Sequence, residues 1–320
     1  MMLPAVVRPF ELDVAIAQAE DYARRARSEA TRTAYGADLR DFERYCTTAG
    51  LLALPATPQT VVLYVTALAQ RGAKISTIRR RLVGLSIAHK DRGHDTPTAH
   101  AVVRAVVRGI ANAHGSAVTR KAALTDDLLP ATLLATGDGL KGARDRAIVL
   151  LGFSAALRRS EIGALEVRDL RFDQRGLVVT LRRSKTDQVG EGREIGIPFV
   201  DVEQLCAVRA VRRWLDVAGI AEGAVFRAFN AQRQMQATPI AGRDVARLLQ
   251  RLTLRAGLAG DFSGHSLRAG FVTSAAAKGV AESAIMQTSG HRSVAILRSY
   301  VRRATVFDGS PLGVIFAARG

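Results

Sequence analysis

The chain reads Gly264-His265-Ser266-Leu267-Arg268, then Gly290-His291-Arg292 and then Tyr300 in its last quarter. The second half of the chain contains no other histidine and no other tyrosine. Arginine clamps phosphate oxygens in a planar fork, and histidine donates a hydrogen bond or accepts a proton near neutral pH. A tyrosine hydroxyl acts as a nucleophile where its phenolate is stabilised. This combination indicates a site for phosphate chemistry.

The composition is that of a basic protein with enough apolar residues for a large core. The 320 residues include 46 Lys and Arg against 29 Asp and Glu, a formal net charge of +17, and 48% are hydrophobic. The positive excess occurs in both halves of the chain. Such a charge favours a polyanionic partner, most simply nucleic acid, although a merely soluble basic protein has the same signature.

Cysteine usage and the N-terminus indicate the compartment. Cys46 and Cys206 lie far apart, which excludes a CxxC zinc site and a disulfide framework, so we expect both as small core side chains. The N-terminus has no signal-peptide pattern. The longest apolar run, Ala147 to Leu157, is well short of the roughly 18 residues of a membrane span. We therefore expect a soluble, cytoplasmic, nucleoid-associated protein with no membrane contact.

Helical periodicity dominates the first third of the chain. Thr57-Pro58-Gln59 is a good helix start, because proline fits the first helical position. A polar linker follows at residues 112–122. We predict an all-α domain over residues 1–115 and a second domain over residues 116–320. The predicted helices begin near Glu11 and run over Thr33–Cys46, Pro58 to Gly72, Ser76 to Gly93, and Pro97 to His114, the last with Val102, Val103, Val106 and Ile110 inward.

The fourth predicted helix begins with a cluster of basic and hydroxyl residues. Such a cluster suits phosphate contacts and entry into the major groove of DNA. A solvated basic helix face is an equally good interpretation of these residues on their own. The candidate DNA-binding residues are Lys74, Ser76, Thr77, Arg79, Arg80 and Arg81.

The second domain is predicted to be mostly helical with a small antiparallel sheet. Its hydrophobic period changes from 3.6 to 2 after residue 165 and then returns to 3.6. The expected strands are Val167–Phe172, Gly176–Arg183 and Arg193–Pro198. The expected helices start at Thr125 with Leu128, Leu129, Leu133 and Leu134 inward, and continue over Arg144–Leu157, Ser160–Leu165, Asp201–Ala218, Ala241–Ala256, Gly264–Lys278, Ala281–Met286 and a last helix with Tyr300.

Two candidate residues lie upstream of the histidines. Arg158 follows an apolar helix that can hold its guanidinium rigidly as a phosphate clamp, although it could also cap that helix or pair with Glu161. Lys185 lies where the second strand gives way to a turn, from which a mobile lysine could reach a substrate. Taken alone, Lys185 is better explained as an ordinary turn lysine.

The remaining candidates depend on helical spacing. His265 and Arg268 are three apart and share one helix face, and Gly264 permits close backbone approach. His291 and Tyr300 are nine apart, so His291 must lie on the turn before the Tyr300 helix if both face one site. Tyr300 could otherwise be a core aromatic residue. Each residue alone favours the structural explanation, whereas their joint order does not.

That order resembles the tyrosine recombinase, or phage integrase, family, which includes Cre. The family pattern is Arg, then Lys in a β-hairpin, then His-x-x-Arg, then His or Trp, then Tyr. It falls in turn on Arg158, Lys185, His265, Arg268, His291 and Tyr300, with Glu161 at the family's acidic position. The first domain looks like the family's helical SAM-like core-binding domain, so the resemblance covers roughly residues 11–308.

The resemblance implies a site-specific recombinase or integrase that uses a 3′-phosphotyrosine intermediate. Arg158 and Arg268 would grip one DNA phosphate, His265 and His291 would add hydrogen bonds, and His265 would accept the tyrosine proton. Tyr300 would attack phosphorus while Lys185 protonates the departing 5′-hydroxyl. The resemblance implies no cofactor and no metal, because the arginines supply the positive charge.

The resemblance also implies partners, namely double-stranded DNA with a recombination site and a homo-tetramer on two duplexes. The apolar tail at residues 311–318 would dock on a neighbouring subunit, or on its own domain. The sequence leaves open an accessory directionality factor. Two rival functions are a type IB topoisomerase or telomere-resolvase-like enzyme and an inactive DNA-binding relative, and the intact residue set argues against the latter.

Overall fold

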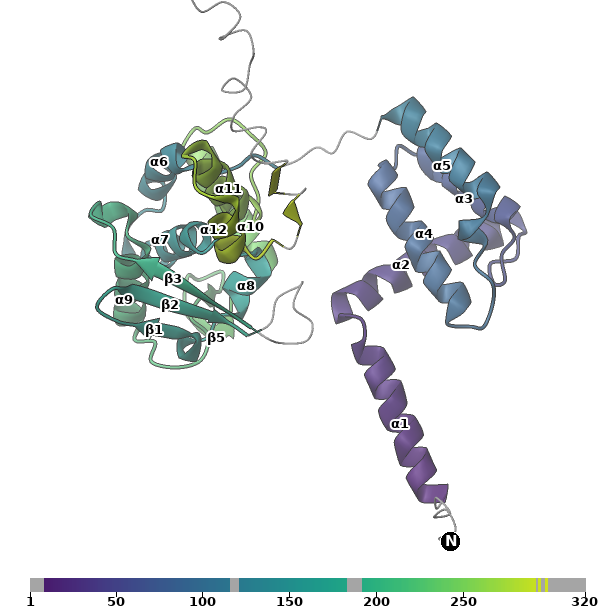
Figure 1. Ribbon diagram of the computed structural model, residues 1–320, viewed down its shortest axis with the longest axis horizontal. Helices are drawn as coiled ribbons and strands as arrows, with labels where there is room; N and C mark the ends of the chain where they lie inside the picture. The colour runs from purple at the N-terminus through teal and green to yellow at the C-terminus, as the bar shows by residue number, and fades with distance from the viewer. Residues whose placement is uncertain (1–8, 116–120, 183–191, 292, 295–296, 299–320) are drawn as a thin grey trace, which may run out of the picture. The chain divides into compact units, whose positions relative to one another are not determined.

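The computed structural model describes residues 9–115, 121–182, 192–291, 293–294 and 297–298. The chain divides into two compact units, Met1–Thr119 and Arg120–Gly320. Helices make up most of both units, and the strands form small antiparallel sheets in the second (Figure 1). The predicted fold class is therefore confirmed. No helix of the described residues is both long and apolar enough to cross a membrane.

The first unit is a helical domain in which α2 to α5 enclose a core. Its helices are α1 (Pro9–Arg25), α2 (Glu29–Ala49), α3 (Pro58–Gln70), α4 (Ile75–Lys90) and α5 (Ala101–His114). The predicted start of α3 is confirmed, because the Thr57 hydroxyl accepts a hydrogen bond from the Thr60 amide and Pro58 takes the first helical position. Fully buried residues from α2 to α5 form the core, including Phe42, Tyr64, Ile78, Leu85 and Val103.

Polar side chains also tie the helices of this unit together. The Tyr64 hydroxyl donates to an Asp41 oxygen at 2.8 Å and accepts from Arg81 at 2.7 Å, joining α2, α3 and α4. Buried His89 accepts a hydrogen bond from the Ala56 amide. The prediction that Val102 points inward is wrong: its side chain is 38% exposed, and α5 instead buries Val103 and Val107.

The second unit is built around α7 (Gly139–Ser154), whose residues from Ala147 to Gly152 are buried. Trp214 of α9 is also fully buried in this core and donates to the Val225 carbonyl. The other helices are α6 (Leu129–Leu134), α8 (Arg159–Ala164), α9 (Ala207–Ala218), α10 (Gly242–Arg255), α11 (Ser266–Ala277) and α12 (Glu282–Ser289) (Figure 1). The prediction that Leu134 is buried is wrong, because it is the last residue of the short α6 and is 82% exposed.

A three-stranded antiparallel sheet lies in the second unit, in the order β1 (Leu170–Phe172), β2 (Gly176–Leu181) and β3 (Arg193–Pro198). The predicted β3 is confirmed, and its first residue, Arg193, pairs with Leu181 at the end of β2. The predicted first strand is too long, since residues 167–169 form a 3-10 turn. A second hairpin, β4 (Arg227–Phe229) with β5 (Met235–Pro239), was not predicted, because its short strands have no clear alternation.

Close packing of α11 depends on Gly270. The Leu124 amide donates to the Ser266 carbonyl at the start of α11. A side-chain methyl on Gly270 would overlap the Leu124 carbonyl oxygen. The segment at Leu124 therefore lies directly against the backbone of α11, the helix that carries Arg268.

We expect Gly270→Ala to destabilise the second unit by about 1–3 kcal/mol, the usual range for overpacking, because the clashing atom is backbone and cannot rotate away. Thermal unfolding measures this loss. The matched control is Gly109→Ala in α5, where the added methyl meets open space and should stabilise the helix by about 0.5–1 kcal/mol. Equal effects of the two substitutions would contradict the packing argument.

Candidate active site

Arg158 lies at the junction between α7 and α8. The residues between these helices, from Ala155 to Leu157, are buried, and Ala156 has a left-handed φ of 49°. Arg158 is the N-cap residue of α8, and its Nη1 donates to Glu161 Oε1 at 2.5 Å. The Arg158 amide donates to the other oxygen of Glu161 at 2.8 Å. Buried Glu161 therefore holds both the backbone and the side chain of Arg158.

Arg268 reaches the same junction from α11. Its side chain is 1% exposed, and its Nη1 donates to the Ala156 carbonyl at 2.9 Å. An unusual turn at Ala156 thus presents a carbonyl to a guanidinium that is far away in sequence. Left-handed backbone in a residue other than glycine is uncommon and is found often at functional sites.

The two histidines flank these arginines. His265 is the N-cap residue of α11 rather than a residue within it, so it precedes Arg268 by nearly one turn. His291 follows Gly290, the C-cap residue of α12, and its Nδ1 lies 2.8 Å from the Ser289 hydroxyl. This hydrogen bond orients the imidazole. The close approach predicted at Gly264 is to the side chain of Arg159 rather than to backbone.

The two histidines and the arginines act on one another electrostatically. Partial burial of the His265 ring lowers its pKa, and Arg268 and Arg158 lower it further. Burial likewise lowers the pKa of His291 to about 4, with contributions from Arg268, Arg158, His265 and Arg193. Both imidazoles are therefore neutral at physiological pH in this positive environment. A neutral imidazole can accept a proton or donate a hydrogen bond.

Arg193 is a member of this cluster that the sequence reasoning missed. Burial lowers its pKa, and so does Arg158, while Glu161 opposes the shift. The Arg193 Nη1 lies against Gly290, so closely that a side-chain methyl there would overlap it. The available signal was a basic residue at the start of the predicted third strand together with a glycine immediately before His291.

Two predicted residues, Lys185 and Tyr300, lie outside the described part of the chain. Lys185 is in the connection between β2 and β3, which begins at residue 182 and ends before Arg193. Of the seven predicted catalytic residues, the structure gathers Arg158, Glu161, His265, Arg268 and His291. The catalytic roles of all seven residues stay predictions.

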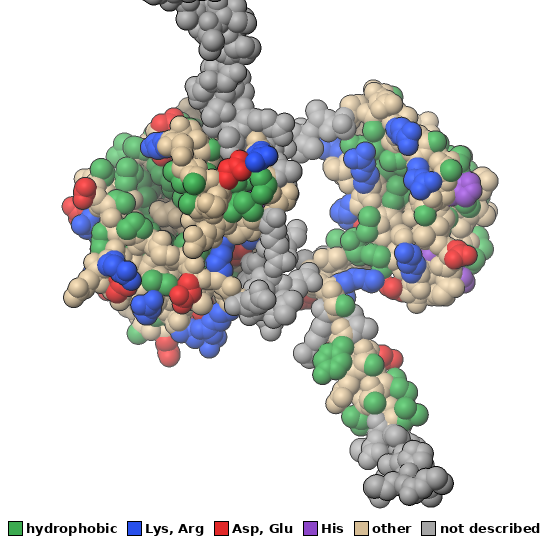
Figure 2. Space-filling view, in the orientation of Figure 1, with side chains coloured by type: hydrophobic (Ala, Val, Ile, Leu, Met, Phe, Trp, Pro, Cys, Tyr) green, Lys and Arg blue, Asp and Glu red, His purple; other side chains and the backbone are tan. Residues whose placement is uncertain are grey.

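The predicted DNA-binding residues lie at and just before the start of α4. Lys74, Ser76, Arg79 and Arg80 are exposed, and Thr77 is half-buried. Arg81 is half-buried and forms an ion pair with Asp41 besides its bond to Tyr64, and Arg80 pairs with buried Asp38. On the face shown in Figure 2, Lys and Arg side chains lie over α4 and α5 with few acidic ones. Arg81 thus acts within the domain, and its DNA contact stays a prediction.

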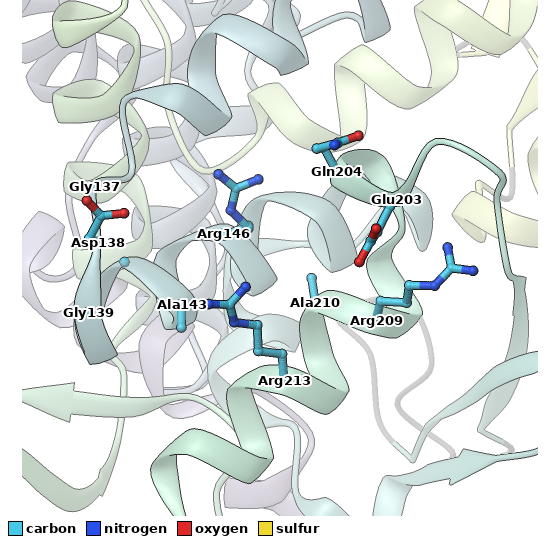
Figure 3. A pocket seen from close by; sticks show the side chains of 11 residues that line it. Gly137, Asp138, Gly139, Ala143, Arg146, Glu203, Gln204, Arg209, Ala210 and Arg213 are labelled. Atoms are coloured by element: carbon cyan, nitrogen blue, oxygen red, sulfur yellow. The ribbon is translucent and has the colours of Figure 1, made fainter.

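A separate hollow of about 420 Å³ lies at the other end of α7. Figure 3 shows Arg146 of α7 with Arg209 and Arg213 of α9 around it. Arg146 and Arg209 each donate to a backbone carbonyl, so they have structural roles. Because α7 has 16 residues, its two ends are about 24 Å apart. This hollow is therefore distinct from the cluster around Arg158.

We expect the His291 ring to titrate near pH 4 in the DNA-free protein, which an NMR titration can follow. Arg158→Met should raise this midpoint, because it removes a neighbouring positive charge. The unfolded chain takes up the same proton at about pH 6.5. The contribution of His291 to stability is therefore fully present above pH 6.5 and is lost as the pH falls toward 4. A midpoint at or above 6.5 would contradict the buried, positive environment.

Two family models match this chain. The model of the phage integrase family matches residues 124–305, and that of the phage integrase N-terminal SAM-like domain matches residues 20–86. An "Integrase/recombinase xerD homolog" of Selenomonas ruminantium is 34% identical over 297 residues, which are 91% of this chain and 87% of that protein.

Solved structures share the fold. A lambda integrase dimer bound to a COC′ core site has a TM-score of 0.60 at 16% identity, over 93% of this chain and 82% of that one. The XerH site-specific recombinase bound to palindromic difH substrate has a TM-score of 0.61 at 16% identity, over 88% of this chain and 78% of that one. From the family match and the 34% identical relative, the chain belongs to the phage integrase family of tyrosine recombinases, enzymes that break and rejoin DNA strands.

Proposed function

We propose that this protein is a site-specific recombinase that cuts and rejoins double-stranded DNA through a 3′-phosphotyrosine intermediate. The observation that carries the proposal is the convergence of Arg158, Arg268, His265 and His291 at one place in a member of this family. Two arginines and two neutral imidazoles suit a phosphodiester, because the arginines match its charge and the imidazoles can handle a proton.

In this proposal the phosphate oxygens are bound by Arg158 and Arg268, and Glu161 keeps Arg158 in place. Tyr300 attacks phosphorus, and His265 accepts its proton. The lowered pKa of His265 keeps its imidazole neutral at neutral pH, so the ring is free to accept a proton. His291 donates a hydrogen bond to the phosphate. Lys185 gives a proton to the 5′-hydroxyl that leaves. The 5′-hydroxyl of another strand then attacks the phosphotyrosine, so the bond energy is conserved.

DNA binding by the helical unit is assigned to the start of α4. Lys74, Ser76, Thr77 and Arg79 are proposed to contact the DNA directly, since no described ion pair engages the two charged ones. Arg80 and Arg81 are proposed to add to the positive field while they neutralise Asp38 and Asp41. Salt dependence of binding should reflect these phosphate contacts.

The proposed assembly is a homo-tetramer that holds two DNA duplexes, with residues 311–318 docking on a neighbouring subunit. These tail residues lie outside the described part of the chain. Head-to-tail contacts of this kind close into a ring. An accessory directionality factor would be a further partner of the assembled complex.

Tyr300→Phe should keep DNA binding and lose all covalent complex, because the hydroxyl is the proposed nucleophile. The measurement is a nicked suicide duplex carrying the native site, run on a denaturing protein gel beside a native gel shift. Tyr22→Phe is the matched control, since Tyr22 is exposed in the helical unit. A covalent band from Tyr300→Phe would overturn the assignment, and site-independent relaxation of plasmids by the wild type would favour a type IB topoisomerase activity.

Lys185→Ala should slow cleavage of a normal phosphodiester by about 10²–10⁴-fold, the usual contribution of a general acid. A substrate with sulfur at the 5′-bridging position has a leaving group that needs no proton, so it should restore most of the rate. Equal defects on both substrates would mean that Lys185 only positions the DNA.

A further inference from the structure

The guanidinium of half-buried Arg193 lies in the candidate active site, and its terminal nitrogens have no hydrogen-bond partner among the described residues. Both of its terminal nitrogens, Nη1 and Nη2, are enclosed, and neither donates to a described group. A buried guanidinium normally has a carboxylate or several carbonyls around it, because desolvating a charge without a partner is expensive. Glu161 is the carboxylate that acts electrostatically on Arg193, but both of its oxygens accept hydrogen bonds from Arg158.

The surrounding backbone keeps Arg193 in this position. Arg193 is the first residue of β3 and is anchored by its pairing with Leu181 of β2. Its Nη1 occupies the space that a side chain at residue 290 would fill. That space is available to Nη1 because residue 290 is a glycine. Gly290 ends α12 and leads directly to His291. The backbone of Arg193 is therefore fixed by the sheet, and its guanidinium is fixed by its contact with the end of α12.

The charge count of the cluster shows what Arg193 adds. Arg158 and Arg268 with Glu161 have a net charge of +1, and the two histidines are neutral. A phosphodiester carries one negative charge, so this set matches the ground state. Attack by a phenolate oxygen gives a pentacoordinate phosphorus with two negative charges. Arg193 raises the net charge of the cluster to +2, which matches the transition state instead.

We propose that Arg193 is a third phosphate-binding arginine, which stabilises the charge that develops on the non-bridging oxygens during cleavage. This inference rests on the proposed function and adds a residue to it. In the reaction the Tyr300 oxygen forms a bond to phosphorus and gives its proton to a base. The bond to the 5′-oxygen breaks as that oxygen takes a proton from the general acid. Arg193 exchanges no proton. It acts by charge and hydrogen bonding, which strengthen as the second negative charge appears.

Arg193→Met tests the proposal, because methionine keeps much of the apolar stem and removes the charge. Cleavage of the suicide duplex should fall about 10²–10³-fold, the usual effect of removing one such donor, while the Kd for the DNA changes less than about 3-fold, because the lost interaction is strongest in the transition state. The cleavage rate of Arg193→Lys should lie between those of the wild type and Arg193→Met. Arg175→Met is the matched control, since Arg175 is exposed beyond the opposite end of β2 and should cleave at the wild-type rate.

A methylphosphonate at the cleaved position separates a role in catalysis from a role in stability. Replacing one non-bridging oxygen by methyl removes one negative charge from the transition state, so the two remaining arginines suffice. The ratio of wild-type to Arg193→Met rates should then shrink to less than about 10-fold, by the charge complementarity argued above. A structural role would leave this ratio unchanged and would lower the Tm instead.

The outcomes are distinguishable from failure of the proposed function. A wild-type protein that forms no covalent complex would refute the function itself. A wild type that cleaves, with Arg193→Met equally fast or equally slowed on both substrates, would refute only the role of Arg193. Gly290→Ala supplies a second test, because its methyl displaces the Arg193 guanidinium. It should slow cleavage, whereas Gly219→Ala, at a helix end with a similar φ and open space, should not.

Discussion

The hydrogen bond from buried Arg268 to the Ala156 carbonyl is the contact on which the candidate site depends. It joins α11 to the turn after α7, and that turn also sets the position of Arg158 at the start of α8. Two guanidinium groups repel each other, so they lie near one another only because the rigid elements that carry them are packed together. The close contact of Gly270 with Leu124 holds α11 at this distance.

Concentrated positive charge then determines the chemistry of the neighbours. The two imidazoles are kept neutral, with the pKa of His291 near 4, first because burial disfavours the charged ring and then because a further positive charge in the cluster is unfavourable. The same field would stabilise a phenolate or an anionic phosphate. The arginines repel one another in the DNA-free protein. An anion that enters the cluster relieves this repulsion, and the relief adds to the free energy of binding.

The helical unit shows the opposite treatment of charge. Arg80 and Arg81 there meet Asp38 and Asp41, and the Tyr64 hydroxyl completes the network. These groups pair with one another, so they join helices rather than await a ligand. Near the start of the same helix, exposed Lys74 and Arg79 have no described carboxylate partner. Within a few residues, some basic side chains therefore join helices and others face solvent.

The sequence by itself determined the helical class, the small sheet, the start of α3 at Thr57 and Pro58, and the family, because these follow from local periodicity, capping chemistry and the order of chemical residues. Burial of individual residues was less predictable. Leu134 and Val102 fit a helical apolar stripe, but the short α6 and the rotation of α5 leave them exposed.

Only the tertiary structure decided which charged residues meet. Arg193 is an ordinary strand residue by pattern. Its place in the cluster depends on the β2–β3 register and on the space at Gly290, which lies far from Arg193 in the sequence. Likewise, Arg79 and Arg81 look alike in a basic run, and only the packing of α4 against α2 and α3 gives Arg81 an acidic partner. Local sequence sets helix and strand, whereas long-range packing sets the partners of each charge.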